Sequence, residues 1–116
     1  MDKTSHVYIL TNHRNGTLYT GVTSDLVRRV SQHRDGSFPG FTKEHGLKHL
    51  VWHEAHPDIE TAIRREKTLK RWQRAWKLAL IEAQNPDWCD LWPTLFGDSA
   101  GTPLPREKLG PGSSPG

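Results

Sequence analysis

Four side chains of this sequence carry groups that could act together on a phosphate: two phenols, a guanidinium and a carboxylate. They belong to Tyr8, Tyr19, Arg29 and Glu66. Hydrolysis of a phosphodiester bond needs a base for the attacking water, a fixed cation on the phosphate, and a metal ion that neutralises the phosphate and the leaving oxygen. The four residues could supply this set if the fold brings them together.

The two phenols belong to a predicted β-hairpin over residues 6–22. In an antiparallel pair joined by a loop of even length, an even-numbered residue faces an odd-numbered one. Tyr8, Leu10, Tyr19 and Gly21 therefore share one face. The glycine indicates a surface where a ligand approaches the backbone closely. Taken singly, each tyrosine is more often a part of the core than a catalyst.

The guanidinium belongs to a predicted amphipathic helix. Leu26, Arg29, Val30 and His33 are spaced by three, four and seven residues, which places them on one helix face. An arginine on the apolar side needs an anionic partner, because burial of an unpaired guanidinium is costly. Arg28 projects about 100° away and is the candidate for a solvated charge. His33 by itself is more often a core histidine with locally satisfied nitrogens.

The carboxylate of Glu66 is the one acid in a basic segment, residues 64–77, which holds seven basic side chains. Glu66 shares a helical stripe with Ala62, Ile63 and Leu69. A carboxylate beside an apolar stripe and surrounded by positive charge is most often an ion-pair partner. The alternative is a ligand for a hard cation such as Mg²⁺.

The basic segment also has two interpretations. Clustered basic side chains with interleaved aromatics, here Trp72 and Trp76, are typical of a surface that tracks phosphates. The alternative is a solvated helix face whose tryptophans belong to the core. The candidate nucleic-acid-binding residues are Arg28, Arg64, Arg65, Lys67, Lys70, Arg71, Arg74 and Lys77.

Two strands, a helix, a third strand and a long helix must position these side chains. Strand-like runs flank the turn signal Asn15-Gly16, cap residues 23–25 precede the first helix, and a loop over residues 36–46 precedes the third strand. The predicted elements are strands over residues 6–12 and 16–22, a helix over 26–34, a strand over 47–55, and a helix from about 59 to about 83 that stops at Asn85-Pro86. The order β, β, α, β, α predicts a small α/β (α+β) domain whose three-stranded sheet is mainly antiparallel and flanked by helices.

Composition divides the chain of 116 residues into a domain and a tail. Residues 96–116 contain five Gly, four Pro and three Ser, and few residues that could fill a core. We therefore expect a folded domain over residues 1–95 and a disordered tail over residues 96–116. The charges of the tail cancel, so the net charge of +3 belongs to the domain and permits an anionic partner.

The sequence also excludes several classes of protein. The single cysteine, Cys89, excludes an internal disulfide framework and a multi-cysteine zinc site, and it directs any metal towards oxygen ligands. No run approaches the ~18 apolar residues of a membrane-spanning helix, and the start of the chain lacks the pattern of a signal peptide. We expect a cytoplasmic protein with no membrane partner.

Four blocks of the sequence, taken in order, resemble the GIY-YIG nuclease superfamily. The resemblance is to its small stand-alone bacterial members and to the N-terminal nuclease domain of the excision-repair endonuclease. His6-Val7-Tyr8 stands at GIY, Tyr19-Thr20-Gly21 at YIG with the following run into the first helix, AIRREKTLKRW surrounds Glu66, and NPDWCDL resembles the terminal motif of the stand-alone members. The match covers residues 6 to about 92.

The resemblance implies a role for each site residue. Tyr8 is the general base or a phenol that orients water, assisted by His33, and Tyr19 helps to orient the attack. Arg29 holds the scissile phosphate, and Glu66 binds one divalent cation, Mg²⁺ or Mn²⁺. A free tyrosine has a pKa near ~10, so Tyr8 acts as a base only if nearby cations such as Arg29, or hydrogen bonds, favour its phenolate.

The chain departs from the family pattern at three positions that are not catalytic. His6 stands where the family has Gly, and Val7 and Thr20 stand where it has Ile. Gly21 and Asn85 are structural positions of the motifs. For Asn85 the end of a helix is a sufficient explanation, although some relatives have a functional asparagine there.

The function implied by the resemblance is a divalent-metal-dependent DNA endonuclease that hydrolyses phosphodiester bonds in DNA repair or recombination, on branched, damaged or single-stranded substrates. The expected partner is DNA rather than RNA, and the sequence does not decide whether the chain forms a homodimer. One alternative is a noncatalytic nucleic-acid-binding module on the same fold, and another is a structural or toxin-like interaction protein. The five functional side chains of the family are all present, which favours the enzyme.

Overall fold

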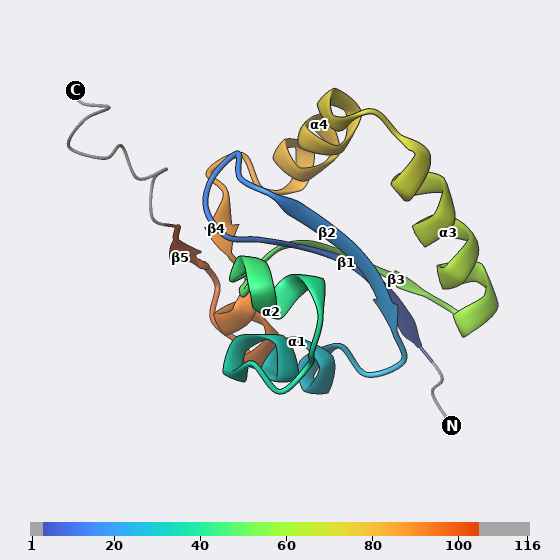
Figure 1. Cartoon of the computed structure of the whole chain (residues 1–116), viewed down its shortest axis with the longest axis horizontal. Helices are drawn as coiled ribbons and strands as arrows, with labels where there is room; N and C mark the ends of the chain where they lie inside the picture. Colours follow the sequence, from blue (N-terminus) through green and yellow to red (C-terminus); the bar gives the residue numbers. More distant parts are fainter. Residues whose placement is uncertain (1–3, 105–116) are drawn as a thin grey trace.

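Three antiparallel strands in the order β2-β1-β3 form the sheet that carries the predicted site. The structure, a computed structural model, describes residues 4–104. The strands are β1 (Ser5–Thr11), β2 (Leu18–Thr23) and β3 (His49–His56). Helices α1 and α2 lie on one side of this sheet, and α3 and α4 lie on the other (Figure 1). The predicted α+β class with an antiparallel three-stranded sheet is confirmed.

The hairpin of β1 and β2 has the predicted register. Tyr8 pairs with Gly21 and Leu10 pairs with Tyr19, so these four side-chain positions share one face. In the turn Asn15 has a φ of 60°, a left-handed conformation that asparagine tolerates better than most residues. The local sequence therefore sets which face of the sheet carries the two tyrosines.

Helix α1 (Leu26–Asp35) begins and ends where the sequence indicates. The side chain of Asp25 caps it by accepting a hydrogen bond from the backbone N–H of Arg28, at 3.1 Å. Gly36 ends it with a φ of 79°, a conformation that favours glycine. In contrast, the predicted loop after Gly36 contains a short helix, α2 (Phe41–His45), which the sequence analysis did not predict.

The prediction of one long helix from about residue 59 to about residue 83 is wrong in one respect, because this segment forms two helices. Helix α3 (Ile59–Arg71) ends at Trp72, whose ψ of 144° is extended, and α4 (Arg74–Gln84) begins after Gln73. The Trp72 ring packs against the buried core and lies edge to face with Trp76, with ring centroids 5.9 Å apart. The break turns the chain so that both helices contact the sheet (Figure 1), which tertiary packing decides rather than helix propensity.

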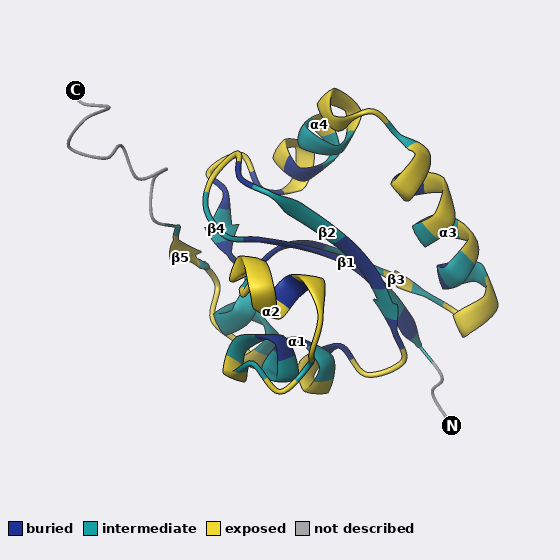
Figure 2. Cartoon of the chain, in the orientation of Figure 1, coloured by how far each residue is buried: buried dark blue, intermediate teal, exposed yellow. Residues whose placement is uncertain are grey.

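The two faces of the sheet carry two separate hydrophobic clusters. Val7 and Ile9 of β1 point into a cluster with residues of α3 and α4, and Tyr8 and Leu10 point into a cluster with residues of α1. This is the two-residue alternation of a strand covered on both faces. In Figure 2 the strands are largely buried, whereas the outer sides of α3 and α4 are exposed.

The segment after α4 forms a second, two-stranded sheet of β4 (Cys89–Asp90) and β5 (Thr102–Pro103), separated by a 3-10 helix, Trp92–Phe96. Residues 96–104 of the predicted tail are thus attached to the domain by backbone pairing. Residues 105–116 lie outside the described residues, so the predicted division of the chain remains a prediction. Among residues 4–104, no helix has the length and apolar character needed to cross a membrane.

Candidate active site

Tyr8 and His33 form the centre of the candidate site. The Tyr8 hydroxyl lies 3.0 Å from Nε2 of His33, and both side chains are buried. The Tyr8 ring crosses Gly21: a Cβ atom at this position would lie 2.5 Å from Oη of Tyr8. The glycine is therefore needed to admit the Tyr8 ring, which explains it without a ligand, and the expected approach of a ligand to the backbone stays a prediction.

His33 of α1 contacts α2, strand β2 and the segment between α1 and α2. Its Nδ1 lies 2.9 Å from Oγ1 of Thr42 in α2. The rings of Tyr19 and Phe38 pack against it, with centroids at 5.8 Å and 4.6 Å. His33 is therefore both a core histidine with satisfied nitrogens and a neighbour of the two predicted catalytic tyrosines.

The pKa values show that both partners of the central hydrogen bond are neutral. Burial, together with the charge of Arg29, lowers the pKa of His33 to about 4. Burial and the neighbouring Tyr19 raise the pKa of Tyr8 well above its ordinary value, and the opposing effect of Arg29 is smaller. Arg29 therefore favours a Tyr8 phenolate as expected, but its effect is not sufficient, because desolvation of the buried phenol outweighs the attraction.

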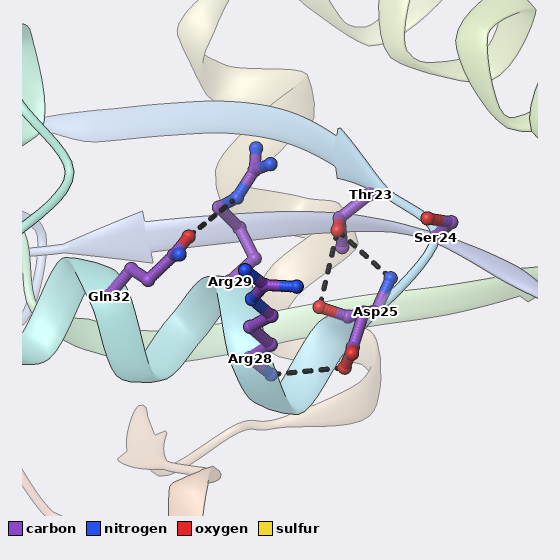
Figure 3. Close-up of a pocket in the computed structure, with 6 residues that line it drawn as sticks. All are labelled: Thr23, Ser24, Asp25, Arg28, Arg29 and Gln32. Carbon is purple, nitrogen blue, oxygen red and sulfur yellow. Dashed lines mark hydrogen bonds between the residues drawn. The ribbon is translucent and has the colours of Figure 1, made fainter.

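Arg28 and Arg29 line one pocket with a volume of about 280 Å³ at the start of α1. Both side chains extend from α1 towards the sheet (Figure 3). Arg29 is positioned by Gln32, whose Oε1 accepts from Nε at 3.3 Å, and by the Phe38 ring, whose centroid lies 4.6 Å from Cζ. Among the described residues, no carboxylate lies within ion-pair distance of either guanidinium. The pocket can therefore receive an anion.

This pocket adds to the prediction for Arg28. Arg28 is exposed, as expected for a solvated charge on a different helix face from Arg29. It nevertheless lines the same pocket as Arg29, together with Thr23, Ser24, Asp25 and Gln32. Long flexible side chains can converge from neighbouring helix positions, which residue spacing alone does not show.

Glu66 of α3 is close enough for its charge to raise the pKa of Tyr8. Its side chain is only 14% exposed, and Oε2 lies 2.8 Å from Nζ of Lys70, so the ion-pair interpretation is realised in the structure. Among residues 4–104, no group of three or more His, Cys, Asp or Glu side chains is placed to hold a metal ion. A single carboxylate still fits Mg²⁺, which keeps several waters and binds protein through one or two carboxylates plus phosphate oxygens.

The predicted nucleic-acid-binding residues fall into two groups. Arg65 pairs with Glu54 at 3.0 Å, Lys70 pairs with Glu66, and Arg74 donates to the carbonyl oxygens of the β1–β2 turn. These three side chains have structural partners. Lys77 is half-buried, and the remaining residues of the segment are exposed on α3: Arg64, Lys67 and Arg71.

Asn85 is a buried structural residue. Its Nδ2 donates to the carbonyl oxygens of Val51 and Cys89 at 3.0 Å and 2.8 Å, and its Oδ1 accepts from the backbone N–H of Cys89 at 2.9 Å. The side chain therefore holds the end of α4 to β3 and to the start of β4. The helix-stop interpretation is sufficient, although its backbone φ of −140° is not the left-handed cap.

Two residues of the candidate site, Phe38 and Thr42, are not indicated by the sequence. Both belong to the segment read as a loop, and neither residue type nor spacing indicates contact with His33. One available signal was Gly46, which ends α2 with a φ of 65° and follows a run without helix breakers.

Comparison with known proteins gives a consistent result. Residues 4–79 match a family model described as the GIY-YIG catalytic domain. A UPF0213 protein of Xanthomonas axonopodis pv. citri is 39% identical over 79 residues, which cover 68% of this chain and 76% of that protein. A UPF0213 protein of Staphylococcus aureus is 35% identical over 78 residues, covering 67% and 95%. The solution structure of the UPF0213 protein BH0048 from Bacillus halodurans aligns with a TM-score of 0.48 and 30% identity over 84% of this chain and 99% of that one.

Proposed function

The chain belongs to the GIY-YIG family of catalytic domains, as its motifs indicate, and on this premise we propose that it is a metal-dependent endonuclease that hydrolyses phosphodiester bonds of DNA. One observation carries the proposal: a neutral tyrosine hydroxyl lies 3.0 Å from Nε2 of a neutral histidine, next to a pocket whose two arginines form no ion pair among residues 4–104. This arrangement combines a route for a proton with a site for a phosphate.

The proton route starts at Tyr8. Because Tyr8 keeps its proton at neutral pH, it accepts a proton from water only while its own proton moves to Nε2 of His33. His33 is free to accept, because its pKa of about 4 leaves it neutral. Tyr19 packs against both rings and limits their movement.

The phosphate site is the arginine pocket. Arg29 holds the scissile phosphate, and its contacts with Gln32 and Phe38 fix the guanidinium before substrate binds. Arg28 lies in the same pocket and holds the same phosphate or its neighbour. Charge on the phosphate oxygens rises in the transition state, so the fixed guanidinium of Arg29 stabilises it more than the ground state, and Arg28 adds a second positive charge.

The metal site is Glu66. Glu66 would hold one divalent ion, which would supply neutralisation of charge on the phosphate and on the leaving oxygen. The carboxylate must then give up or share its contact with Lys70. The exposed basic residues of α3 bind the flanking DNA backbone, and the expected substrates are branched, damaged or single-stranded DNA in repair or recombination.

The test is a cleavage assay with purified protein and flap, fork, nicked, single-stranded and duplex DNA. We expect cleavage with Mg²⁺ and none with a chelator. Arg29→Ala and Glu66→Ala should each lower kcat by about 10²-fold or more, since each removes charge stabilisation of the transition state, while thermal unfolding changes little. Arg14→Ala, an exposed position in the β1–β2 turn, is the control and should cleave like the unchanged chain.

Two results would contradict the proposal. Binding without cleavage of any of these DNAs would support the noncatalytic module. Chelator-resistant cleavage that persists in Glu66→Ala would exclude Glu66 as the metal ligand and leave the arginine pocket and the Tyr8–His33 pair to explain the activity.

A further inference from the structure

His33 is held from both sides. Nε2 faces the Tyr8 hydroxyl at 3.0 Å, and Nδ1 faces Oγ1 of Thr42 at 2.9 Å. His33 and Thr42 are each only 2% exposed, so water does not compete for either nitrogen. A neutral imidazole has one N–H donor and one acceptor nitrogen, and the partner of one nitrogen decides the state of the other.

The direction of the hydrogen bond to Tyr8 follows from its other neighbour. The guanidinium of Arg29 interacts with the Tyr8 oxygen and lowers the pKa of the phenol. A guanidinium only donates, so the Tyr8 oxygen acts as an acceptor towards Arg29. The Tyr8 proton needs an acceptor of its own, and among residues 4–104 the one found within hydrogen-bond distance is Nε2 of His33.

If Nε2 accepts, the proton of the neutral ring is on Nδ1 and points at Thr42. We propose that Thr42 is a positioning residue, whose hydroxyl oxygen accepts from Nδ1–H of His33 and thereby keeps Nε2 as the acceptor for the Tyr8 proton. This inference rests on the proposed nuclease activity for its catalytic consequence, but the tautomer itself is a property of the protein without substrate.

The proton balance of the proposed reaction explains why this contact affects the rate. Water gives one proton to the Tyr8 oxygen and bonds to phosphorus, while the Tyr8 proton moves to Nε2 and the bond from phosphorus to the leaving oxygen breaks. The leaving oxygen takes a proton from solvent, and His33 later returns its proton to solvent. In the imidazolium both N–H groups have an acceptor, Thr42 on one side and Tyr8 on the other.

The elements that pack against His33 bring one charged group and two titratable phenols close to its ring. Arg29 comes from its own helix, Tyr8 from β1 and Tyr19 from β2. Phe38 and Thr42 add no charge. The positive charge of Arg29 disfavours the imidazolium form of His33. The Thr42 hydroxyl stabilises that form, because its oxygen accepts a hydrogen bond from Nδ1–H.

Thr42→Val and Thr42→Ser test the proposal as a matched pair. Valine keeps the shape and removes the oxygen, whereas serine keeps the hydroxyl. We expect Thr42→Val to lower kcat by about 10-fold to 100-fold, the usual effect of losing a group that orients a catalytic histidine, with KM unchanged because Thr42 does not contact substrate. Thr42→Ser should stay within a few-fold of the unchanged chain.

The ring ¹⁵N shifts of His33, measured by NMR in the protein without DNA, provide a second readout. The unchanged chain and Thr42→Ser should show the proton on Nδ1, and Thr42→Val should lose this preference. Thermal unfolding shows whether each variant is folded. A purely structural role would lower the melting temperature of Thr42→Val without changing the tautomer of its folded fraction, and that result would overturn the proposal.

The two proposals fail in different ways. If the unchanged chain cleaves none of the DNAs, the proposed function fails, while the ¹⁵N shifts still decide whether Thr42 sets the tautomer. If the unchanged chain cleaves DNA and Thr42→Val has the same kcat, the role of Thr42 is wrong and the nuclease proposal stands. If the unchanged chain carries its proton on Nε2, the role of Thr42 is wrong and His33 cannot accept the Tyr8 proton; cleavage would then still support the nuclease but not this proton route.

Discussion

His33 illustrates how burial decides the chemistry of a single residue. From the sequence it is a histidine on the inner face of a helix, with a core role and a catalytic role both open. In the structure the same contacts with Tyr8 and Thr42 satisfy its nitrogens and orient its lone pair. The structural and the catalytic interpretation are therefore compatible, because a group that accepts the Tyr8 proton must be held in a fixed orientation.

The lowered pKa of His33 also predicts how stability depends on pH. The pKa is about 4 in the folded chain against an ordinary value of 6.5, so between these values the unfolded chain binds a proton that the folded chain does not. The free energy of unfolding should therefore fall as the pH is lowered from about 6.5 to about 4. His33 alone contributes about 3 kcal/mol to this loss.

Urea denaturation at about pH 7 and about pH 4 measures the effect. His33→Gln should reduce the loss of stability between the two pH values, and His45→Gln, at an exposed position, should not. Burial also lowers the pKa values of His6 and His53, so part of the loss remains in His33→Gln. An unchanged loss in His33→Gln would show that His33 does not resist protonation in the folded chain.

Among the elements, the two-residue strand β4 ties the C-terminal segment to the rest of the domain through one carboxylate. Oδ2 of Asp90 lies 2.7 Å from Nη1 of Arg34 and 2.9 Å from Nδ1 of His49. Oδ1 accepts from the backbone N–H groups of Leu50 and Trp92 at 3.3 Å and 3.0 Å. Asp90 thus joins α1, β3 and the segment after β4.

Replacement of Asp90 should therefore destabilise the whole domain. Asp90→Ala leaves the partners of a buried carboxylate without an acceptor, and we expect a loss of about 3 kcal/mol in the free energy of unfolding. Asp87→Ala, at an exposed position, is the control and should change stability little. Urea denaturation of both variants at neutral pH makes the comparison, and equal stability of the two would mean that Asp90 contributes no more than a surface charge.

Over the whole molecule, the site is formed where the two layers of helices approach the hairpin. Helix α1 brings Arg29 and His33 to one face of the sheet, and α3 on the other side brings Glu66 close enough to act on Tyr8. The exposed basic residues of α3 lie on the same helix as Glu66. If Glu66 is the metal ligand that we propose, a DNA backbone that reaches it passes the helix that carries these charges.

Salt should consequently weaken DNA binding steeply. Each neutralised phosphate adds about 0.9 to the negative slope of log affinity against log salt concentration. The triple variant Arg64→Gln, Lys67→Gln, Arg71→Gln should reduce the slope by about 2 to 3, and Lys48→Gln, an exposed lysine before β3, should leave it unchanged. Fluorescence anisotropy in a salt titration measures both slopes, and a slope that the triple variant does not change would favour the solvated-face interpretation.

The sequence by itself determined the elements whose signals are local. The hairpin register, the cap at Asp25 and the stop at Gly36 follow from turn chemistry and from the two-residue period of a strand. Local rules therefore placed Tyr8 beside Tyr19 and Arg29 on the inner side of α1.

Only the tertiary structure decided the features that depend on contacts between distant residues. The helix breaks at Trp72 because the Trp72 ring packs against the core. Helix α2 places Thr42 within hydrogen-bond distance of His33. The protonation states of Tyr8 and His33 depend on desolvation, which no residue carries in its own type. Burial and long-range packing are properties of the folded chain, and for that reason the sequence predicted the shared face of Tyr8 and Tyr19 but neither the contacts of Phe38 and Thr42 nor the protonation states of Tyr8 and His33.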